Sequence, residues 1–275
     1  MSDADIITIA IAGPGGRVGQ RLVAAVEAAD DLRLVGGLVR PGSPLVGQAL
    51  AGAPQAMMTD DPAVLLAMAD VVIDFTTPAA TRALALAAAG LGGGATTAGA
   101  AIVSGTTGLA AADEAALDRA AERVAVVHAA NMSPAIHLLA GLVQRATKAL
   151  GPAWDIEIVE MHHRHKVDAP SGTALLLGQA AAAGRGARLE HLRLAARDGV
   201  TGERPAGSIG FASLRGGDVV GEHQVILAGA GERVVLGHVA ADRGLFAAGA
   251  LAAARVIAGR PAGRYTLGQL MGLDD

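Results

Sequence analysis

Apolar runs alternate with amphipathic stretches through the first half of the chain. Nearly continuous aliphatic runs occur at residues 6–12, 32–39, 69–75, 100–104 and 124–128. Helical patterns separate them, for example at residues 17–29, at 62–68 and after Pro78. Strands that are apolar throughout are typical of a parallel sheet with helices on both faces. The first half therefore predicts an α/β, Rossmann-like parallel sheet.

The second half has a different pattern. A long helix is predicted at residues 134–150, and the polar–apolar alternation at 154–161 predicts a half-exposed strand. A helix at 171–183 precedes four predicted strands, at 188–197, 208–214, 218–227 and 233–240, which Gly-rich turns connect. An Ala-rich helix follows at 243–259. We expect a dinucleotide-binding domain of residues 1–132 and 243–275, and an α+β domain of residues 133–242 with an open, mixed sheet.

Composition narrows the classes of protein. The 275 residues are 52% hydrophobic but only 2% aromatic, which indicates a core of small aliphatic side chains. The net charge of −4 gives no reason to expect a nucleic acid or an anionic membrane as partner. With no cysteine, the chain has no disulfide, thiolate metal site or cysteine nucleophile. The sequence lacks a signal-peptide pattern and an apolar run that could span a bilayer, so we expect a cytoplasmic protein.

A glycine-rich turn follows the first predicted strand and opens the first helix. It reads Gly-Pro-Gly-Gly-Arg-Val-Gly over residues 13–19. A dinucleotide pyrophosphate needs backbone N–H groups at a helix N-terminus, and glycines where a Cβ would block its approach. A tight strand–helix turn can also require glycine for steric reasons alone. The position after the first strand favours cofactor binding.

The end of the second predicted strand bears on cofactor choice. In NAD enzymes an acidic residue usually accepts the ribose hydroxyls at this position. Here Val39 cannot accept a hydrogen bond, whereas Arg40 can pair with a 2′-phosphate, with Arg17 beside it. The sequence therefore favours NADPH, with weaker use of NADH, although Arg40 could also be a solvated surface residue.

Small polar residues follow three later strands, in the segments 75–78, 105–108 and 129–133. The carboxyl ends of parallel strands meet at one edge of the sheet, where cofactors bind. Each segment alone could simply cap a helix. Their shared placement predicts contacts with the nicotinamide and its ribose.

Residues 160–173 read Glu-Met-His-His-Arg-His-Lys-Val-Asp-Ala-Pro-Ser-Gly-Thr. Packing alone does not require so many imidazoles and cations together. Hydride addition to a C=N or conjugated C=C bond leaves negative charge on the adjacent atom, which a histidine can protonate while a lysine steadies substrate charge. Ser171, Gly172 and Thr173 resemble a helix start whose N–H groups can hold a carboxylate. We therefore expect a reductase active centre in this segment.

Other interpretations remain open from the residues alone. The histidines with Glu160 could bind a metal, but Arg164 and Lys166 would repel a divalent ion, so we expect none. Ser171 could be only a structural N-cap. A different enzyme on the same scaffold, such as an amino-acid dehydrogenase, or a non-catalytic NADP(H) sensor would keep the glycine turn. Neither would need the whole 160–173 segment.

The motif Glu-x-His-His-x-x-Lys-x-Asp-Ala-Pro-Ser-Gly-Thr, together with the glycine turn, residues 105–108, 201–204 and 221–223, resembles the 4-hydroxy-tetrahydrodipicolinate (dihydrodipicolinate) reductase family. The resemblance covers essentially the full chain. It implies NAD(P)H-dependent reduction of a small dicarboxylate, with loss of water, in the diaminopimelate route to lysine. It also implies a homotetramer assembled through the sheet of the second domain.

The same resemblance implies roles for individual residues. His162 would donate the proton, Lys166 would assist as a second donor, and His163 would contact substrate. The substrate carboxylates would bind Lys166, Ser171, Gly172 and Thr173, with Arg243. The expected cofactor contacts are Gly13, Pro14, Gly15, Gly16, Arg17, Val18, Arg40, Phe75, Thr76, Gly105, Thr106, Thr107, Ala129, Ala130, Asn131 and Met132.

The chain departs from the family's usual pattern at a few positions. Val39 stands where an acidic residue is usual, and Met132 where phenylalanine is usual. The residues after Ser133 read Pro-Ala-Ile-His, ending at His137, in place of a typical Gly-Val-Asn ending. The Gly-rich stretch 91–101 also looks longer than usual, and the sequence suggests no function for it.

Overall fold

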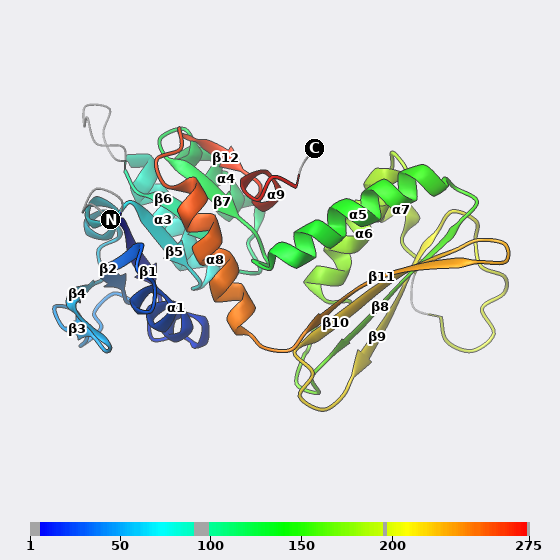
Figure 1. Ribbon diagram of the computed structural model, residues 1–275, viewed down its shortest axis with the longest axis horizontal. Helices are drawn as coiled ribbons and strands as arrows, with labels where there is room; N and C mark the ends of the chain where they lie inside the picture. Colours follow the sequence, from blue (N-terminus) through cyan, green and yellow to red (C-terminus); the bar gives the residue numbers. More distant parts are fainter. Residues whose placement is uncertain (1–5, 91–98, 195–196, 274–275) are drawn as a thin grey trace. The chain divides into compact units, whose positions relative to one another are not determined.

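The computed structural model describes residues 6–90, 99–194 and 197–273, and the chain divides into two compact units. Unit 1 runs to Ser133 and resumes at Gly244–Gly272, whereas unit 2 is Pro134–Arg243 together with Leu273. Each unit has its own sheet (Figure 1). Most of the Gly-rich stretch singled out in the sequence, residues 91–98, lies outside the described residues.

Unit 1 is built on an eight-stranded sheet of order β12-β7-β6-β5-β1-β2-β4-β3. All neighbouring pairs are parallel except β3 with β4. The strands are β1 (Ile7–Ala12), β2 (Leu32–Leu38), β3 (Ala49–Leu50), β4 (Ala53–Thr59), β5 (Val71–Asp74), β6 (Ala101–Ser104), β7 (Ala125–His128) and β12 (Gly263–Tyr265). The predicted Rossmann-like parallel sheet is confirmed.

Alternate residues of a strand point to opposite faces of the sheet, and in this sheet both sets are apolar. Helices therefore cover both faces. Ile9 and Ile11 pack with α1 (Arg17–Glu27), α8 (Gly244–Ile257) and α9 (Leu267–Leu270). Ala10 and Ala12 pack on the other side with α2 (Pro62–Met68), α3 (Pro78–Gly90) and α4 (Ala111–Ala121). Alanine at the second set of positions lets the helices lie close to the strands.

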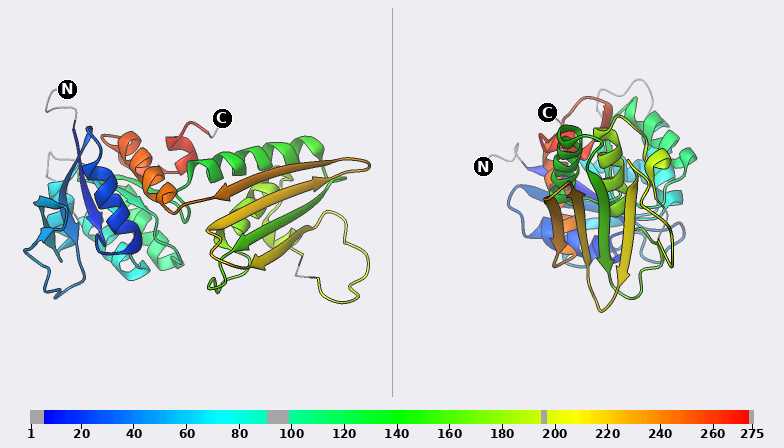
Figure 2. Two further views of the ribbon diagram at one scale, coloured as in Figure 1. Left: turned by 60° about the horizontal axis from the view of Figure 1, so that its bottom comes forward. Right: turned by 90° about the vertical axis from the view of Figure 1, so that its right-hand side faces the viewer.

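Unit 2 contains a four-stranded mixed sheet of order β11-β10-β8-β9. Its strands are β8 (Asp155–His162), β9 (Ile209–Arg215), β10 (Gly221–Ala228) and β11 (Arg233–Ala240), and only the β8–β9 pair is parallel. The helices α5 (Pro134–Leu150) and α6 (Gly172–Gly184) pack together over one face (Figure 2). The predicted open, mixed sheet is confirmed. Pro134 is the first residue of α5, where a missing N–H costs nothing.

The structure differs from the sequence prediction in several places. The predicted strand at 188–197 is wrong: the short helix α7 (Leu189–Leu192) occupies it, followed by a single bridge between Arg193 and Ile209. Strands β3 and β4 lie between the predicted strand at 32–39 and the predicted helix at 62–68, where no strand was expected, and β12 was not expected either. The seven residues of β4, Ala-Pro-Gln-Ala-Met-Met-Thr, include just one β-branched side chain, so their strand signal is weak.

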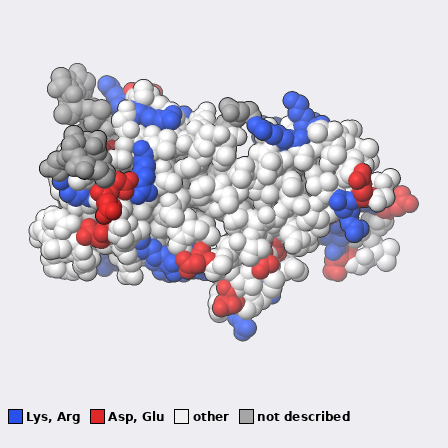
Figure 3. All heavy atoms as spheres, in the orientation of Figure 1, with Lys and Arg blue, Asp and Glu red and all other residues white. Residues whose placement is uncertain are grey.

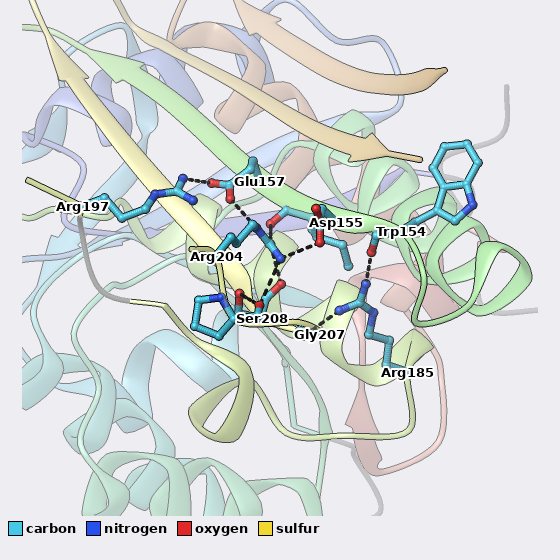
Figure 4. Close-up of polar contacts among 10 residues, drawn as sticks. Trp154, Asp155, Glu157, Arg185, Arg197, Arg204, Gly207 and Ser208 are labelled. Carbon is cyan, nitrogen blue, oxygen red and sulfur yellow. Dashed lines mark hydrogen bonds and ion pairs between the residues drawn. The ribbon is translucent and has the colours of Figure 1, made fainter. Parts of the chain in front are cut away.

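The long connection between α7 and β9 is held to β8 by arginines (Figure 4). Arg204 donates to Asp155 Oδ1 at 2.7 Å, to Glu157 Oε1 at 3.0 Å and to the carbonyls of Ile156 and Ser208. Arg197 donates to the second oxygen of Glu157 at 2.7 Å. Charge-assisted bonds of this kind are stronger than neutral ones. The connection is therefore an anchored segment of unit 2.

The surface is not dominated by one charge. On the face seen in Figure 3, described Lys and Arg side chains are interspersed with Asp and Glu, and uncharged side chains cover most of the area. Among the described residues, no helix combines the length and apolar character needed to cross a bilayer.

Candidate functional site

The glycine turn of unit 1 brings the start of α1 against the end of β1. Gly13 has a φ of +74°, which favours glycine, and its N–H donates to the Leu38 carbonyl at 2.9 Å. A Cβ on Gly19 would lie 2.1 Å from the Gly13 carbonyl oxygen, so the helix can approach this closely only with glycine there. Gly15 has open space at the Cβ position and Gly16 is the N-cap of α1. This exposed backbone fits a dinucleotide phosphate.

A buried carboxyl group, Asp74, organises the next two predicted cofactor segments. It is 0% exposed and accepts hydrogen bonds from four hydroxyls. Thr76 donates at 2.5 Å, Thr81 at 2.6 Å, Ser104 at 2.8 Å and Thr106 at 3.1 Å. Because Thr76 and Thr106 belong to different loops, Asp74 fixes the two loops relative to each other.

Two further contacts join the same loops. The Thr76 N–H donates to Thr106 Oγ1 at 3.0 Å. A Cβ on Gly105 would fall 2.3 Å from the Phe75 ring, so the ring packs directly on the glycine. Thr107 is exposed beside them. The structure thus brings Phe75, Thr76 and residues 105–107 together at the carboxyl edge of the sheet.

The third segment, residues 129–132, joins this edge through the backbone. The Ala129 N–H donates to the Ser104 carbonyl at 3.0 Å, while Ala130 is exposed and Asn131 Oδ1 accepts from the Ser133 N–H at 2.8 Å. Met132 is 1% exposed and packs in the core of unit 1. Its side chain supports the segment from the protein interior.

Arg40 is exposed directly after β2, and Arg17 is exposed in the first turn of α1. Val39 is half-buried against the core, and its N–H donates to the Thr59 carbonyl at 2.9 Å. The position usually taken by an acidic residue is therefore apolar here. The cation beside it is accessible.

In unit 2, Glu160 lies at the centre of a polar cluster. The carboxylate is 1% exposed; Oε2 lies 2.5 Å from His162 Nδ1, and Arg215 donates to both oxygens at 2.9 Å. Burial opposes ionisation, but hydrogen bonds from Arg215, Ser213 and His162 outweigh it and lower the pKa of Glu160 to about 2. An ionised Glu160 requires a proton on His162 Nδ1 and leaves Nε2 for chemistry.

Ser171 links this cluster to the start of α6. Its N–H donates to Glu160 Oε1 at 3.2 Å, and its Oγ accepts from the Ala174 N–H at 3.1 Å as the helix N-cap. Ser171 Oγ also lies 3.0 Å from His223 Nε2. The first helical residues are Gly172, which is exposed, and Thr173. An anion at this helix start would meet N–H groups and the serine hydroxyl.

The remaining predicted residues lie near the same segment. Lys166 pairs with Asp168 at 2.8 Å, and this hydrogen bond lowers the pKa of Asp168. Partial desolvation, with repulsion from Arg243 and nearby cations, lowers the pKa of His163, whose Nδ1 is buried without a hydrogen-bond partner among the described residues. No group of three or more side chains suited to a metal ion occurs in the described part of the chain.

Sequence reasoning missed Asp74, Ser104, Arg215 and His223. Asp74 ends an apolar run of the sequence. A carboxyl group at the end of a buried strand, with no cation next to it in the chain, signals a buried acceptor of hydrogen bonds and could have been noticed. Arg215 and His223 lie on β9 and β10, 55 and 52 positions from their partners, and only sheet pairing brings them to the 160–173 segment.

Comparison with known proteins identifies the family of the chain. The family model for the N-terminus of dihydrodipicolinate reductase matches residues 7–132, and the model for its C-terminus matches residues 135–271. The chain belongs to the dihydrodipicolinate reductase family. Within this family, it is 49% identical to the 4-hydroxy-tetrahydrodipicolinate reductase of Parvibaculum lavamentivorans, with 98% of both chains covered.

Two more comparisons extend this result. The chain is 50% identical to the 4-hydroxy-tetrahydrodipicolinate reductase of Ruegeria pomeroyi, over 96% of this chain and 98% of that one. A dipicolinate-bound dihydrodipicolinate reductase from Paenisporosarcina sp. TG-14 has a similar fold, with a TM-score of 0.74 at 23% identity, covering 95% of this chain and 97% of that one.

Proposed function

We propose that this member of the dihydrodipicolinate reductase family reduces 4-hydroxy-tetrahydrodipicolinate to tetrahydrodipicolinate, with NADPH preferred over NADH. The substrate gains one hydride and one proton, and its hydroxyl leaves with a proton as water. The pairing of His162 with the buried Glu160, next to the Ser171-capped start of α6, carries the proposal. The named relatives, about half identical over nearly the full chain, support it.

The proton comes from unit 2. Glu160 and Arg215 hold the His162 ring by its Nδ1–H, so that Nε2 can deliver the proton when charge develops on the substrate. A Cβ on Gly221 would lie 3.0 Å from Nε2, and its absence leaves room beside this nitrogen. Lys166 is the second proton donor, and its ion pair with Asp168 holds the ammonium group against the 160–173 segment.

The substrate carboxylates bind at the start of α6. Ser171, Gly172 and Thr173 provide a hydroxyl and backbone N–H groups, and Lys166, His163 and Arg243 complete the set. Two carboxylates require a cationic surrounding that the overall charge of −4 does not provide. This local cluster supplies it.

The cofactor would be held by unit 1 and would supply the hydride. Gly13–Val18 would receive the pyrophosphate, and Arg40 with Arg17 the 2′-phosphate. The loops fixed by Asp74, together with residues 129–132, would orient the nicotinamide. We further propose a place in lysine biosynthesis through diaminopimelate, in the cytoplasm, as a homotetramer joined through the sheet of unit 2.

A coupled assay tests the proposal. Purified protein is mixed with NADPH or NADH and the freshly formed product of the preceding aldolase, and the absorbance of the reduced nicotinamide is followed. We expect enzyme-dependent oxidation, faster with NADPH. Cofactor binding without turnover would indicate a sensor protein instead. Turnover with amino acids but not with the aldolase product would indicate another dehydrogenase.

A further inference from the structure

The buried histidine His223 lies outside the 160–173 motif, and the proposed reaction assigns it no role. It lies on β10, is 4% exposed, and contacts the Ser171 hydroxyl through Nε2 at 3.0 Å. Its ring is also edge-on to that of His162, with centroids 5.1 Å apart. A histidine this well enclosed acts through its hydrogen bonds.

The protons available to Ser171 and His223 can be assigned by counting. A serine hydroxyl has one proton to donate and two lone pairs, and one lone pair already accepts from the Ala174 N–H. A neutral imidazole carries a proton on one nitrogen only. Burial, with repulsion from His162, lowers the pKa of His223 to about 4, so the ring is neutral near pH 7.

Two arrangements satisfy the contact. If Ser171 donates to Nε2, the imidazole proton must sit on Nδ1, which is buried without a partner among the described residues. If Nε2–H donates to Ser171, Nδ1 is left only with an unused lone pair. An unpaired buried N–H is rarer and costlier than an unpaired acceptor. The second arrangement is therefore favoured.

We infer that His223 is a positioning residue that fills the second lone pair of Ser171 and so turns the serine proton toward the substrate carboxylate. With both lone pairs used, Ser171 can only donate to a further partner. In the opposite arrangement the oxygen would present a lone pair to an anion and repel it. This inference rests on the proposed function and refines its substrate-binding part.

Kinetics of paired variants test the inference. His223→Gln carries an amide N–H to the place of Nε2, whereas His223→Asn is too short, and His223→Leu has no donor. We expect Asn and Leu to raise KM for the substrate and Kd for dipicolinate about tenfold, as for one lost hydrogen bond to a charged group. Gln should stay within about threefold of wild type, and kcat and the Kd for NADPH should change little. His191→Gln, at an exposed position of α7, is the matched control.

Coupling to Ser171 distinguishes positioning from a general structural effect. In the Ser171→Ala background, His223→Asn should raise KM no further. The inference would be overturned if His223→Asn raised KM equally in the wild-type and Ser171→Ala backgrounds, or if His223→Gln raised KM as much as His223→Asn. The comparison of His223→Gln with His223→Asn decides the question even if His223→Leu does not fold. Turnover by the wild type tests the proposed function separately.

The tautomer itself can be observed without any activity. In histidine-labelled protein, ¹⁵N chemical shifts of the His223 ring, assigned by their loss in His223→Gln, should show a protonated Nε2 and an unprotonated Nδ1. The reverse tautomer would overturn the inference, whatever the reaction of the enzyme.

Discussion

Nδ1 of His162 lies 2.5 Å from Oε2 of Glu160, and the same carboxylate receives two hydrogen bonds from Arg215 at 2.9 Å. The imidazole is thus held by a fixed negative charge, with Nε2 directed elsewhere.

Removing His162, the proposed proton donor, should slow the chemical step. For His162→Gln we expect kcat to fall by about 10²–10⁴-fold with little change in KM, because a general acid acts mainly in the transition state. Steady-state kinetics would measure this. His165→Gln, exposed in the same segment, serves as the control. An unchanged kcat in His162→Gln would assign the proton to another group.

The carboxylate behind the histidine should matter almost as much. Glu160→Gln loses the charge that fixes the Nδ1–H and stabilises the imidazolium, so kcat should fall by roughly 10- to 10³-fold. Glu157→Gln, which also loses ion pairs on β8, should keep kcat near that of wild type. Equal effects of the two substitutions would point to general damage to the strand.

Cofactor choice should depend on Arg40. Arg40→Ala removes the cation available to a 2′-phosphate, and the ratio of kcat/KM for NADPH over NADH should fall by about 10-fold or more. The substitution should leave NADH kinetics almost unchanged. Arg33→Ala, exposed on β2, is the control. A constant ratio would mean that another group recognises the phosphate.

Asp74 should couple stability to cofactor affinity. Asp74→Asn removes the charge and replaces one of the two acceptor oxygens by an NH2 group, so the four hydroxyls can no longer all donate to this side chain. We expect the free energy of unfolding to fall by about 1–3 kcal/mol and the Kd for NADPH to rise. Circular dichroism during urea unfolding and cofactor titration would measure both. Asp70→Ala, just before the same strand, removes the oxygen that accepts from the Thr8 N–H and hydroxyl, and it should destabilise the fold without changing the Kd.

Acid should destabilise unit 2 in two steps. The pKa of His223 is lowered from 6.5 to about 4 in the folded protein. Between pH 6.5 and 4 the unfolded chain therefore carries a proton on this histidine and the folded protein does not, so stability falls as the pH falls through that window. For Glu160, lowered to about 2 from 4.5, stability is lost between pH 4.5 and 2. The stability lost through His223 should be roughly 3 kcal/mol.

The single tryptophan, Trp154, lies in unit 2, so its fluorescence can follow unfolding of that unit. His223→Gln should flatten the decline between pH 6.5 and 4, and His191→Gln should keep it. Parallel declines in both variants would show that other groups control acid stability.

Much of the fold could be predicted because its signals are local. Five continuous aliphatic runs predicted the parallel sheet, and the alternation at 154–161 predicted β8. Residues 188–197 were misread because their aliphatic residues resemble a strand, whereas α7 and the arginine contacts with Glu157 occupy the segment. Strand β4 was missed because its pairing with β2 and β3, not its composition, makes it a strand.

The sequence by itself determined the glycine turn, the 160–173 motif and the family they resemble, since each depends on residues adjacent in the chain. Tertiary structure decided how the site is tuned. Arg215 and His223 reach Glu160 and Ser171 only through the pairing of β8 with β9 and β10, and Asp74 meets Ser104 only because β5 and β6 lie side by side. Hydrogen-bond direction and burial depend on these distant contacts, so they set the charge of Glu160 and the donor role of Ser171.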